Sequence, residues 1–168
     1  MRRRPIPVLA VSLILAGVVG YGLTGTATAQ GGDLELRAQL RGRNEVPVPP
    51  GAPTDPDGRG RARFDITVAS GEVCFEVFFT DTGTPNRGHI HVGGAGVNGG
   101  IVVTLFELVG LPADERNDAL ERGSLSDCVT APADVLAQIE ANPAGYYCNL
   151  HNARFPAGAI RGQLEART

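Results

Sequence analysis

Short runs of alternating apolar and polar residues, separated by turns rich in glycine and proline, constrain the fold of this chain more than any other feature of its sequence. Residues 34–40 (LELRAQL) alternate strictly, as in a half-buried β-strand whose successive side chains point to opposite faces. Further strands are predicted over residues 61–68, 72–80, 87–92, 101–106, 146–151 and 159–166. The pattern predicts a mainly antiparallel all-β fold, a Greek-key or Ig-like β-sandwich.

One short helix is predicted near the C-terminal third, over residues 131–141, with Thr130 as its N-cap and an Asn-Pro pair at its end. Residues 42–60 contain five prolines and four glycines and are therefore predicted to be a loop. The glycine-rich residues 93–100 do not indicate a phosphate-binding loop, because a strand and not a helix follows them. Residues 108–127 are interpreted as an insertion-like loop with one helical turn near 119–122.

The first 29 residues have the features of a signal peptide. Three arginines precede an apolar stretch over residues 8–19, and Ala27-Thr28-Ala29 is a small-x-small cleavage site. An uncleaved membrane anchor is the alternative, but two prolines and four glycines make the segment a poor spanning helix. We therefore expect a signal peptide over residues 1–29, one domain over residues 30–168, and a secreted or cell-envelope location without a membrane span after cleavage.

The charge of the expected mature chain excludes two classes of partner. Without the leader, 12 basic residues stand against 18 acidic ones. Nucleic acids and anionic membranes require a basic protein face, so neither is an expected partner.

Three cysteines in an exported chain predict one disulfide bond and one free thiol. Cys74 shares its strand face with glutamates and is expected to point away from the core. Cys148 shares its face with Leu150 and is expected to point inward, while Cys128 is placed in a loop just before the helix. Strand parity thus favours a Cys74–Cys128 disulfide, with Cys148 buried and reduced.

All three histidines lie in two short strand-like motifs. His89 and His91 form an H-x-H step, whose imidazoles share one strand face, and His151 follows in the segment YYCNLHN. On one interpretation the three imidazoles bind Cu(II) or Zn(II), with a water or carboxylate as the fourth ligand. On the other, favoured because structural histidines are common, each imidazole hydrogen-bonds the backbone of a neighbouring loop.

Other polar side chains are expected on the same face as the histidines. Parity places Asn149 with His151, and it points Arg161 and Gln163 outward from the last strand. If the three strands are neighbours, these side chains form one polar surface and are candidate ligand-binding residues. Arg161 suits a carboxylate or phosphate ligand, although a structural hydrogen-bond fork is the favoured interpretation. No serine stands in a nucleophile motif, and Cys148 and His151 point to opposite faces, so no catalytic residue is assigned.

Four segments together resemble the CHRD domain, a module named after chordin that also occurs singly in exported bacterial proteins. They are residues 40–47 (LRGRNEVP), the H-x-H step before GAGVNG, the segment YYCNLHN at 146–152, and residues 155–164 (FPAGAIRGQL). The resemblance spans roughly residues 33–165 and implies a β-sandwich-like extracellular domain with no established reaction. Its usual cysteine positions agree with a Cys74–Cys128 pair.

The sequence thus predicts an exported CHRD-domain protein that acts as a non-enzymatic binding or structural module of the envelope or extracellular space. Its partner is an unidentified protein or surface ligand. The alternative is a mononuclear copper- or zinc-binding protein that uses His89, His91 and His151 as ligands. The two interpretations differ in one observable, because a metal site requires ligand nitrogens that converge within a few ångströms.

Overall fold

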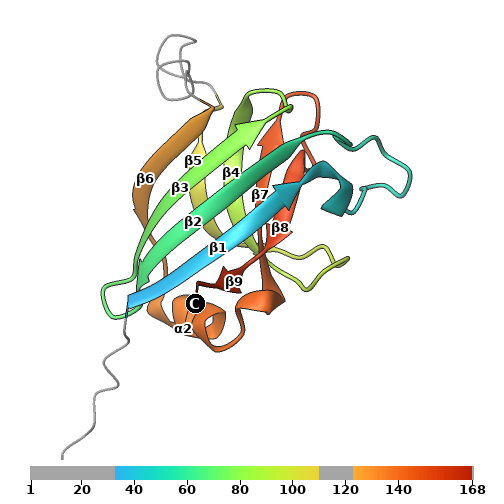
Figure 1. The fold of residues 1–168 in the computed structure, drawn as a ribbon. Helices are drawn as coiled ribbons and strands as arrows, with labels where there is room; N and C mark the ends of the chain where they lie inside the picture. Colours follow the sequence, from blue (N-terminus) through green and yellow to red (C-terminus); the bar gives the residue numbers. More distant parts are fainter. Residues whose placement is uncertain (1–32, 110–122, 168) are drawn as a thin grey trace, which may run out of the picture.

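A computed structural model describes residues 33–109 and 123–167, and in this part of the chain nine strands form one antiparallel sheet (Figure 1). The strands are β1 (Asp33–Arg41), β2 (Arg59–Thr67), β3 (Glu72–Thr80), β4 (Pro85–Val92), β5 (Ile101–Glu107), β6 (Ser124–Thr130), β7 (Tyr146–Asn152), β8 (Ile160–Gln163) and β9 (Glu165–Ala166). The predicted leader and the helical turn at 119–122 lie outside the described residues.

The sheet curls on itself until it is nearly closed. The strand order is β5-β4-β7-β8-β1-β2-β3-β6, with β9 paired to β1, and the edge strands β5 and β6 approach each other. One continuous sheet therefore supplies both facing layers. The connections from β3 to β4 and from β6 to β7 join strands that are not neighbours, so the sheet is no simple meander. The mainly antiparallel β class with one short helix in the last third is confirmed.

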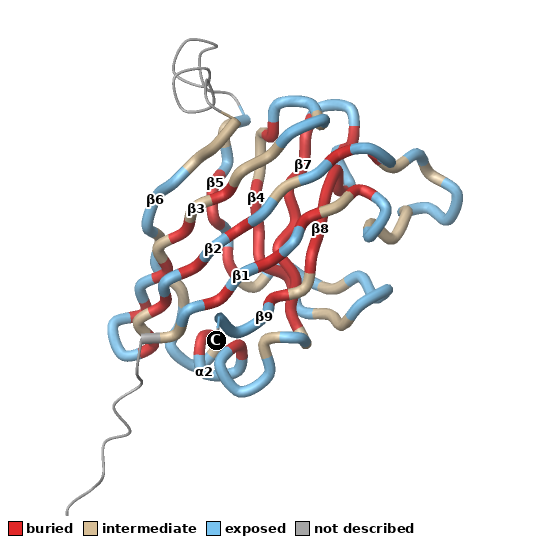
Figure 2. The backbone as a smooth tube through the Cα atoms, viewed as in Figure 1, coloured by how far each residue is buried: buried red, intermediate tan, exposed pale blue. Residues whose placement is uncertain are grey.

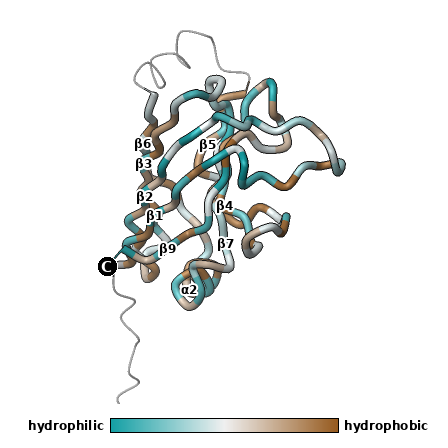
Figure 3. The backbone as a smooth tube through the Cα atoms, turned by 45° about the vertical axis from the view of Figure 1, so that its right-hand side comes forward, coloured by the Kyte–Doolittle hydropathy of each residue, from teal (hydrophilic) through white to brown (hydrophobic). Residues whose placement is uncertain are grey.

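The apolar faces of the strands meet inside the curled sheet. Phe64, Ile66, Ile90 and Leu150 are among its large buried side chains, each at most 1 % exposed. Figure 3 shows hydrophilic and hydrophobic residues mixed along the strands, as the alternating pattern requires. The predicted alternation thus separates one core-facing side of each strand from an outer side.

Helix α2 (Ala133–Ala141) lies at one end of the sheet, near β9 (Figure 1), and buries Leu136 and Ile139 in the core. It begins two residues later than expected. Thr130 is the last residue of β6 and not an N-cap, and Pro132 at the N-cap position makes no side-chain hydrogen bond. Two 3-10 turns, η1 (Gly42–Asn44) and η2 (Pro143–Gly145), flank β1 and β7.

Strand β6 was not predicted, and it changes the position of Cys128. The sequence interpretation placed Cys128 in a loop, whereas it lies in β6 directly opposite Cys74 of β3. Their sulfur atoms are 2.08 Å apart, and Cys148 is a buried free cysteine. The pairing agrees with the expectation, although the local structure around Cys128 was predicted wrongly because β6 is a polar edge strand.

The predicted last strand is divided in two. Residues 160–163 pair with β7, while residues 165–166 pair with β1, and Leu164 between them points into the core with no exposed surface. Within the described residues, no helix is long and apolar enough to cross a membrane.

Candidate metal centre

The histidines come together because β4, β7 and β8 are neighbours in the sheet. His89 lies opposite Asn149, and Asn149 in turn lies opposite Arg161. His91 lies opposite Tyr147, one step along the same two strands. The adjacency on which the predicted polar face depended is therefore present in the structure.

This polar face is covered and does not meet solvent as an open surface. All seven residues of β7 are buried, so the strand is enclosed on both sides (Figure 2). The glycine-rich loop between β4 and β5 covers one part of the face, and Asn98 in this loop donates a hydrogen bond to the carbonyl of Val46. The turn after β7 contributes the carbonyl of Pro156. The histidines thus lie between the sheet and three loop segments.

The three imidazoles lie close together, with one nitrogen of each ring near the other two rings. His89 Nδ1 and His151 Nε2 are 3.1 Å apart, and one nitrogen from each of the three rings lies within 4.8 Å of the other two. Two nitrogens bound to one ion at about 2.1 Å lie about 3.0 Å apart at a right angle and about 3.4 Å apart at the tetrahedral angle. The separation of His89 Nδ1 and His151 Nε2 lies in this range, and it is also the length of a hydrogen bond between the two rings.

The hydrogen-bond partners of the other ring nitrogens show which nitrogen of each imidazole carries the proton. His91 Nδ1 lies 3.0 Å from the carbonyl oxygen of Gly99, and His151 Nδ1 lies 3.1 Å from that of Pro156. A carbonyl only accepts, so both Nδ1 atoms carry the proton and both Nε2 atoms are unprotonated acceptors. Metal-bound histidines characteristically donate their second N–H in this way.

His89 is oriented in the opposite sense, with Nδ1 toward the cluster. Its Nε2 atom is buried without a hydrogen bond and lies 3.6 Å from a carboxylate oxygen of the exposed Glu107. Without metal, the Nδ1 proton of His89 can be donated to His151 Nε2. On metal binding that proton must leave Nδ1, and Glu107 is placed to stabilise a proton on Nε2. Sequence reasoning missed Glu107, because its position beside His89 depends on the pairing of β4 with β5.

Burial keeps the cluster neutral. It is the main cause that lowers the pKa of each of the three histidines, and it lowers the pKa of His151 to about 4. Electrostatic repulsion from His91 adds to the lowering at His89, and repulsion from His89 adds to it at His151. The neutral imidazole is also the form of histidine that can bind a metal ion.

The three predicted ligand-binding residues hydrogen-bond within the chain. Arg161, 1 % exposed, donates to the side-chain oxygen of Asn98 and to the carbonyl of Val97, and its guanidinium lies 3.9 Å from the centre of the Tyr147 ring. Gln163 donates to the carbonyl oxygens of three residues, Gly93, Ala144 and Tyr146. Asn149 donates to Glu45 at 3.5 Å. Through these contacts Arg161 and Gln163 hold the glycine-rich loop against the histidine cluster.

Glu45 is a partly buried acid that sequence reasoning did not select. Burial raises the pKa of its carboxyl to about 8, although Arg161 and the hydrogen bond from Asn149 both oppose the shift. One carboxylate oxygen, Oε1, is buried without a partner. Its position depends on the loop after β1 folding over β7 and β8, a contact between distant parts of the sequence for which the sequence carried no signal.

Cys148 takes no part in the centre. It points into the core from the opposite face of β7 and has no exposed surface. Burial, with a smaller effect of Glu45, raises the pKa of its thiol to about 12, so it is no thiolate at neutral pH. The predicted separation of Cys148 from His151 is confirmed.

Fold and site together define a small β domain with one cross-strand disulfide and a covered histidine cluster. The family model of the CHRD domain matches residues 36–164. The chain belongs to the CHRD domain family, as the four sequence segments predicted. No curated protein and no solved structure matches it.

Replacing Glu45 by Gln is expected to remove a pH dependence of stability. The carboxyl is protonated up to a pKa of about 8 in the folded chain but only up to 4.5 in the unfolded chain. The folded state therefore binds more protons between these values, and its stability falls as pH rises through this window. Relative to the Gln variant, the parent should lose about 2 kcal/mol of unfolding free energy between about pH 6 and pH 7.5, measured by urea denaturation. Parallel profiles for the two proteins would contradict the prediction.

Proposed function

We propose that this protein is an exported CHRD-domain protein that binds a single Cu(II) or Zn(II) ion through His89, His91 and His151. The observation that supports the proposal most directly is the convergence of one nitrogen from each ring within 4.8 Å. The sequence had favoured a structural role, in which each histidine bonds only its own loop. His91 and His151 do bond loop carbonyls, but through Nδ1, which leaves Nε2 of each ring for a metal.

The donor set selects the class of metal. Three neutral imidazoles suit Cu(II) and Zn(II), and Cu(II) binds a given nitrogen site more tightly than Zn(II) in the usual order of affinities. Three protein ligands leave one coordination position for a water or an anion. Arg87 and Arg161 place positive charge near the cluster, since each contributes to a lowered histidine pKa. This charge favours an anion in the fourth position.

Export is the second part of the proposal. It is supported by the leader-like residues 1–29 and by a cysteine pair at bonding distance, because disulfide bonds persist in oxidising compartments. Membership of a family whose domains are expected outside the cell supports it further. A metal site enclosed in a disulfide-linked β domain is suited to conditions outside the cytoplasm.

The test is metal titration of residues 30–168, purified from an oxidising compartment without a histidine tag. Calorimetric titration with Cu(II) and with Zn(II) is expected to show one ion per chain. Free metal at about 100 times the dissociation constant should raise the unfolding free energy by about 2.7 kcal/mol. If neither ion binds with one-to-one stoichiometry, the metal proposal is wrong, and the histidines serve as supports for the loops.

A further inference from the structure

Arginines gather on the outer face of β1 and β2, opposite the core. The chain contains no lysine, so all of its permanently charged basic residues are arginines. Strand alternation turns five of them outward along these two strands, and the pairing of β1 with β2 places Arg41 opposite Arg59, Arg37 opposite Arg63 and Gln39 opposite Arg61. Like charges directly opposite each other destabilise a sheet unless something neutralises them.

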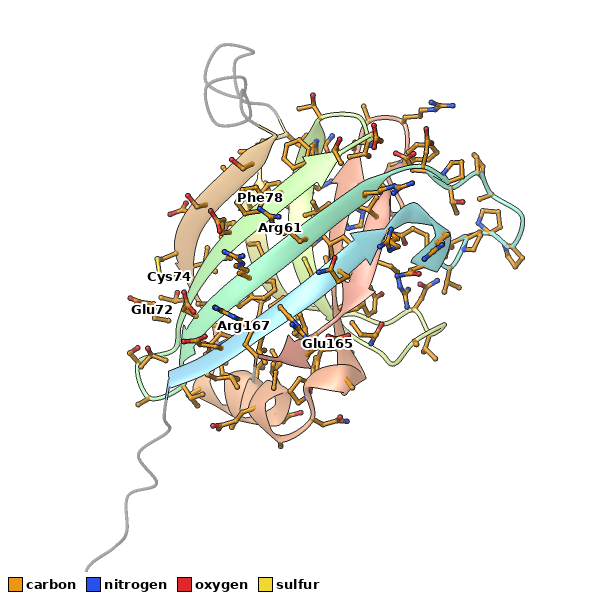
Figure 4. The ribbon with its side chains drawn as sticks, viewed as in Figure 1. Arg61, Glu72, Cys74, Phe78, Glu165 and Arg167 are labelled. Atoms are coloured by element: carbon orange, nitrogen blue, oxygen red, sulfur yellow. A yellow bond between two sulfur atoms is a disulfide. The ribbon has the colours of Figure 1, made fainter. Side chains whose placement is uncertain are left out.

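At one end of this face, carboxylates neutralise the arginines. Arg37 lies 3.4 Å from Glu165, and Arg167 lies 3.0 Å from Glu35. Glu165 and Arg167 are labelled at this end in Figure 4. Arg63, farther along β2, also has a partner, since it lies 3.8 Å from Glu76. These ion pairs leave little free charge for a ligand.

At the other end, Arg41, Arg59 and Arg61 have no carboxylate partner within the described residues. They line a groove of about 420 Å³ together with Gln39 and Phe78. A further hollow, of about 40 Å³, shares Arg41 and Arg59 with this groove. Because they share residues, the two hollows follow one another along β1 and β2, which suits an elongated ligand.

The groove does not have the features of a nucleic-acid site. The guanidinium of Arg61 lies 4.1 Å from the centre of the Phe78 ring (Figure 4), so this aromatic face is already covered and offers no platform for a base.

Apolar atoms contribute to the lining of the groove, but it contains no exposed large hydrophobic side chain that could serve as the centre of a protein interface. The exposed large hydrophobic side chains of the described chain all lie elsewhere: Val48, Val92, Val97, Ile101 and Val109. A protein partner normally buries an apolar centre inside a polar rim. What the groove offers is a set of unpaired guanidinium groups, which match phosphate oxygens with paired N–H donors.

We propose that the groove formed by Arg41, Arg59 and Arg61 binds a linear anionic polymer whose charges are phosphate groups and which carries no bases. Arg59 and Arg61 are two residues apart on one strand, about 7 Å, so they contact successive parts of such a chain. Inorganic polyphosphate and polymers of alditol phosphates share this chemistry. The groove contains none of the histidines, which lie on β4 and β7.

The test measures binding of fluorescently labelled inorganic polyphosphate and of a glycerol phosphate polymer to the metal-free protein at low salt. The variant Arg41→Gln/Arg59→Gln/Arg61→Gln is expected to bind at least about a hundredfold more weakly, since each charge-assisted contact accounts for about tenfold. The salt dependence should also fall by about one unit of slope per arginine. The polymer that binds more tightly identifies which of the two sources supplies the phosphate groups.

The matched control is Arg37→Gln/Arg63→Gln/Arg167→Gln, which removes equal charge from the same face but only from arginines in ion pairs. It should weaken binding less than about fivefold. An equal loss in both variants would mean nonspecific attraction and overturn the proposal, as would absence of binding to either polymer. Single-stranded DNA of equal charge that binds as tightly would also overturn it. Thermal melting shows whether each variant is folded. If the triple variant Arg41→Gln/Arg59→Gln/Arg61→Gln does not fold, the three single substitutions are measured in its place.

Discussion

A variant with His89, His91 and His151 each replaced by Gln is expected to bind Cu(II) or Zn(II) at least about a thousandfold more weakly than the parent chain. Loss of one hydrogen-bond partner of a metal-bound histidine already costs about 10- to 100-fold in affinity. Removal of all three imidazoles leaves no ligand set, because the chain contains no other histidine. Calorimetric titration measures the loss, and the electron paramagnetic resonance spectrum of bound Cu(II) should lose its imidazole nitrogen couplings.

The control for this variant is Asn149→Ser. Asn149 lies between the histidines and Arg161 on the same covered face, so the change disturbs the packing there but removes no imidazole. Its metal affinity should stay within about threefold of the parent, less than the loss of one outer partner. If the triple Gln variant binds metal as tightly as the parent, the metal lies elsewhere. If both variants lose the same metal affinity, the loss comes from disturbed folding and not from the missing imidazoles.

Much of the metal site could be predicted because strand parity is a local property. The H-x-H step fixes His89 and His91 on one face of β4, and the same alternation places His151 and Asn149 on one face of β7. The adjacency of the two strands had to be assumed, since it depends on pairing between residues about 60 positions apart. Nothing local indicated that loops would cover the face, or that Glu107 would lie beside His89.

The one strand of the described sheet that was not predicted, β6, lies where packing is weakest. Strand β6 has the sequence SLSDCVT, with only Leu125 and Val129 turned toward the core, and it pairs with β3 along one edge alone. Its composition resembles that of a loop, and the sheet contact that makes it a strand is remote in the sequence. The same error displaced the helix start, because Thr130 was interpreted as a cap and is instead the last residue paired with Glu72.

Loss of the Cys74–Cys128 bond is expected to lower the unfolding free energy by about 4 kcal/mol. The two cysteines are separated by 54 residues, and cross-linking a loop of this length removes conformational entropy of the unfolded chain by about that amount. The variant Cys74→Ser/Cys128→Ser tests this by urea denaturation. Both side chains lie outside the core, Cys74 partly exposed and Cys128 exposed, so serine replaces them without a cavity or a buried polar group.

The parent protein, reduced and kept under reducing conditions, provides a matched comparison. It keeps both thiols and should lose the same stability as the serine variant, because only the covalent bond is absent. Ser126→Ala, on the same edge strand, should change the unfolding free energy by no more than about 0.5 kcal/mol. Equal denaturation midpoints for the oxidised and reduced parent would show that β6 is held by its pairing alone.

A loss of about 4 kcal/mol is a large part of the 5–15 kcal/mol typical of a domain, so the reduced chain should remain folded but only marginally. An oxidising compartment would then be a condition for a stable metal site.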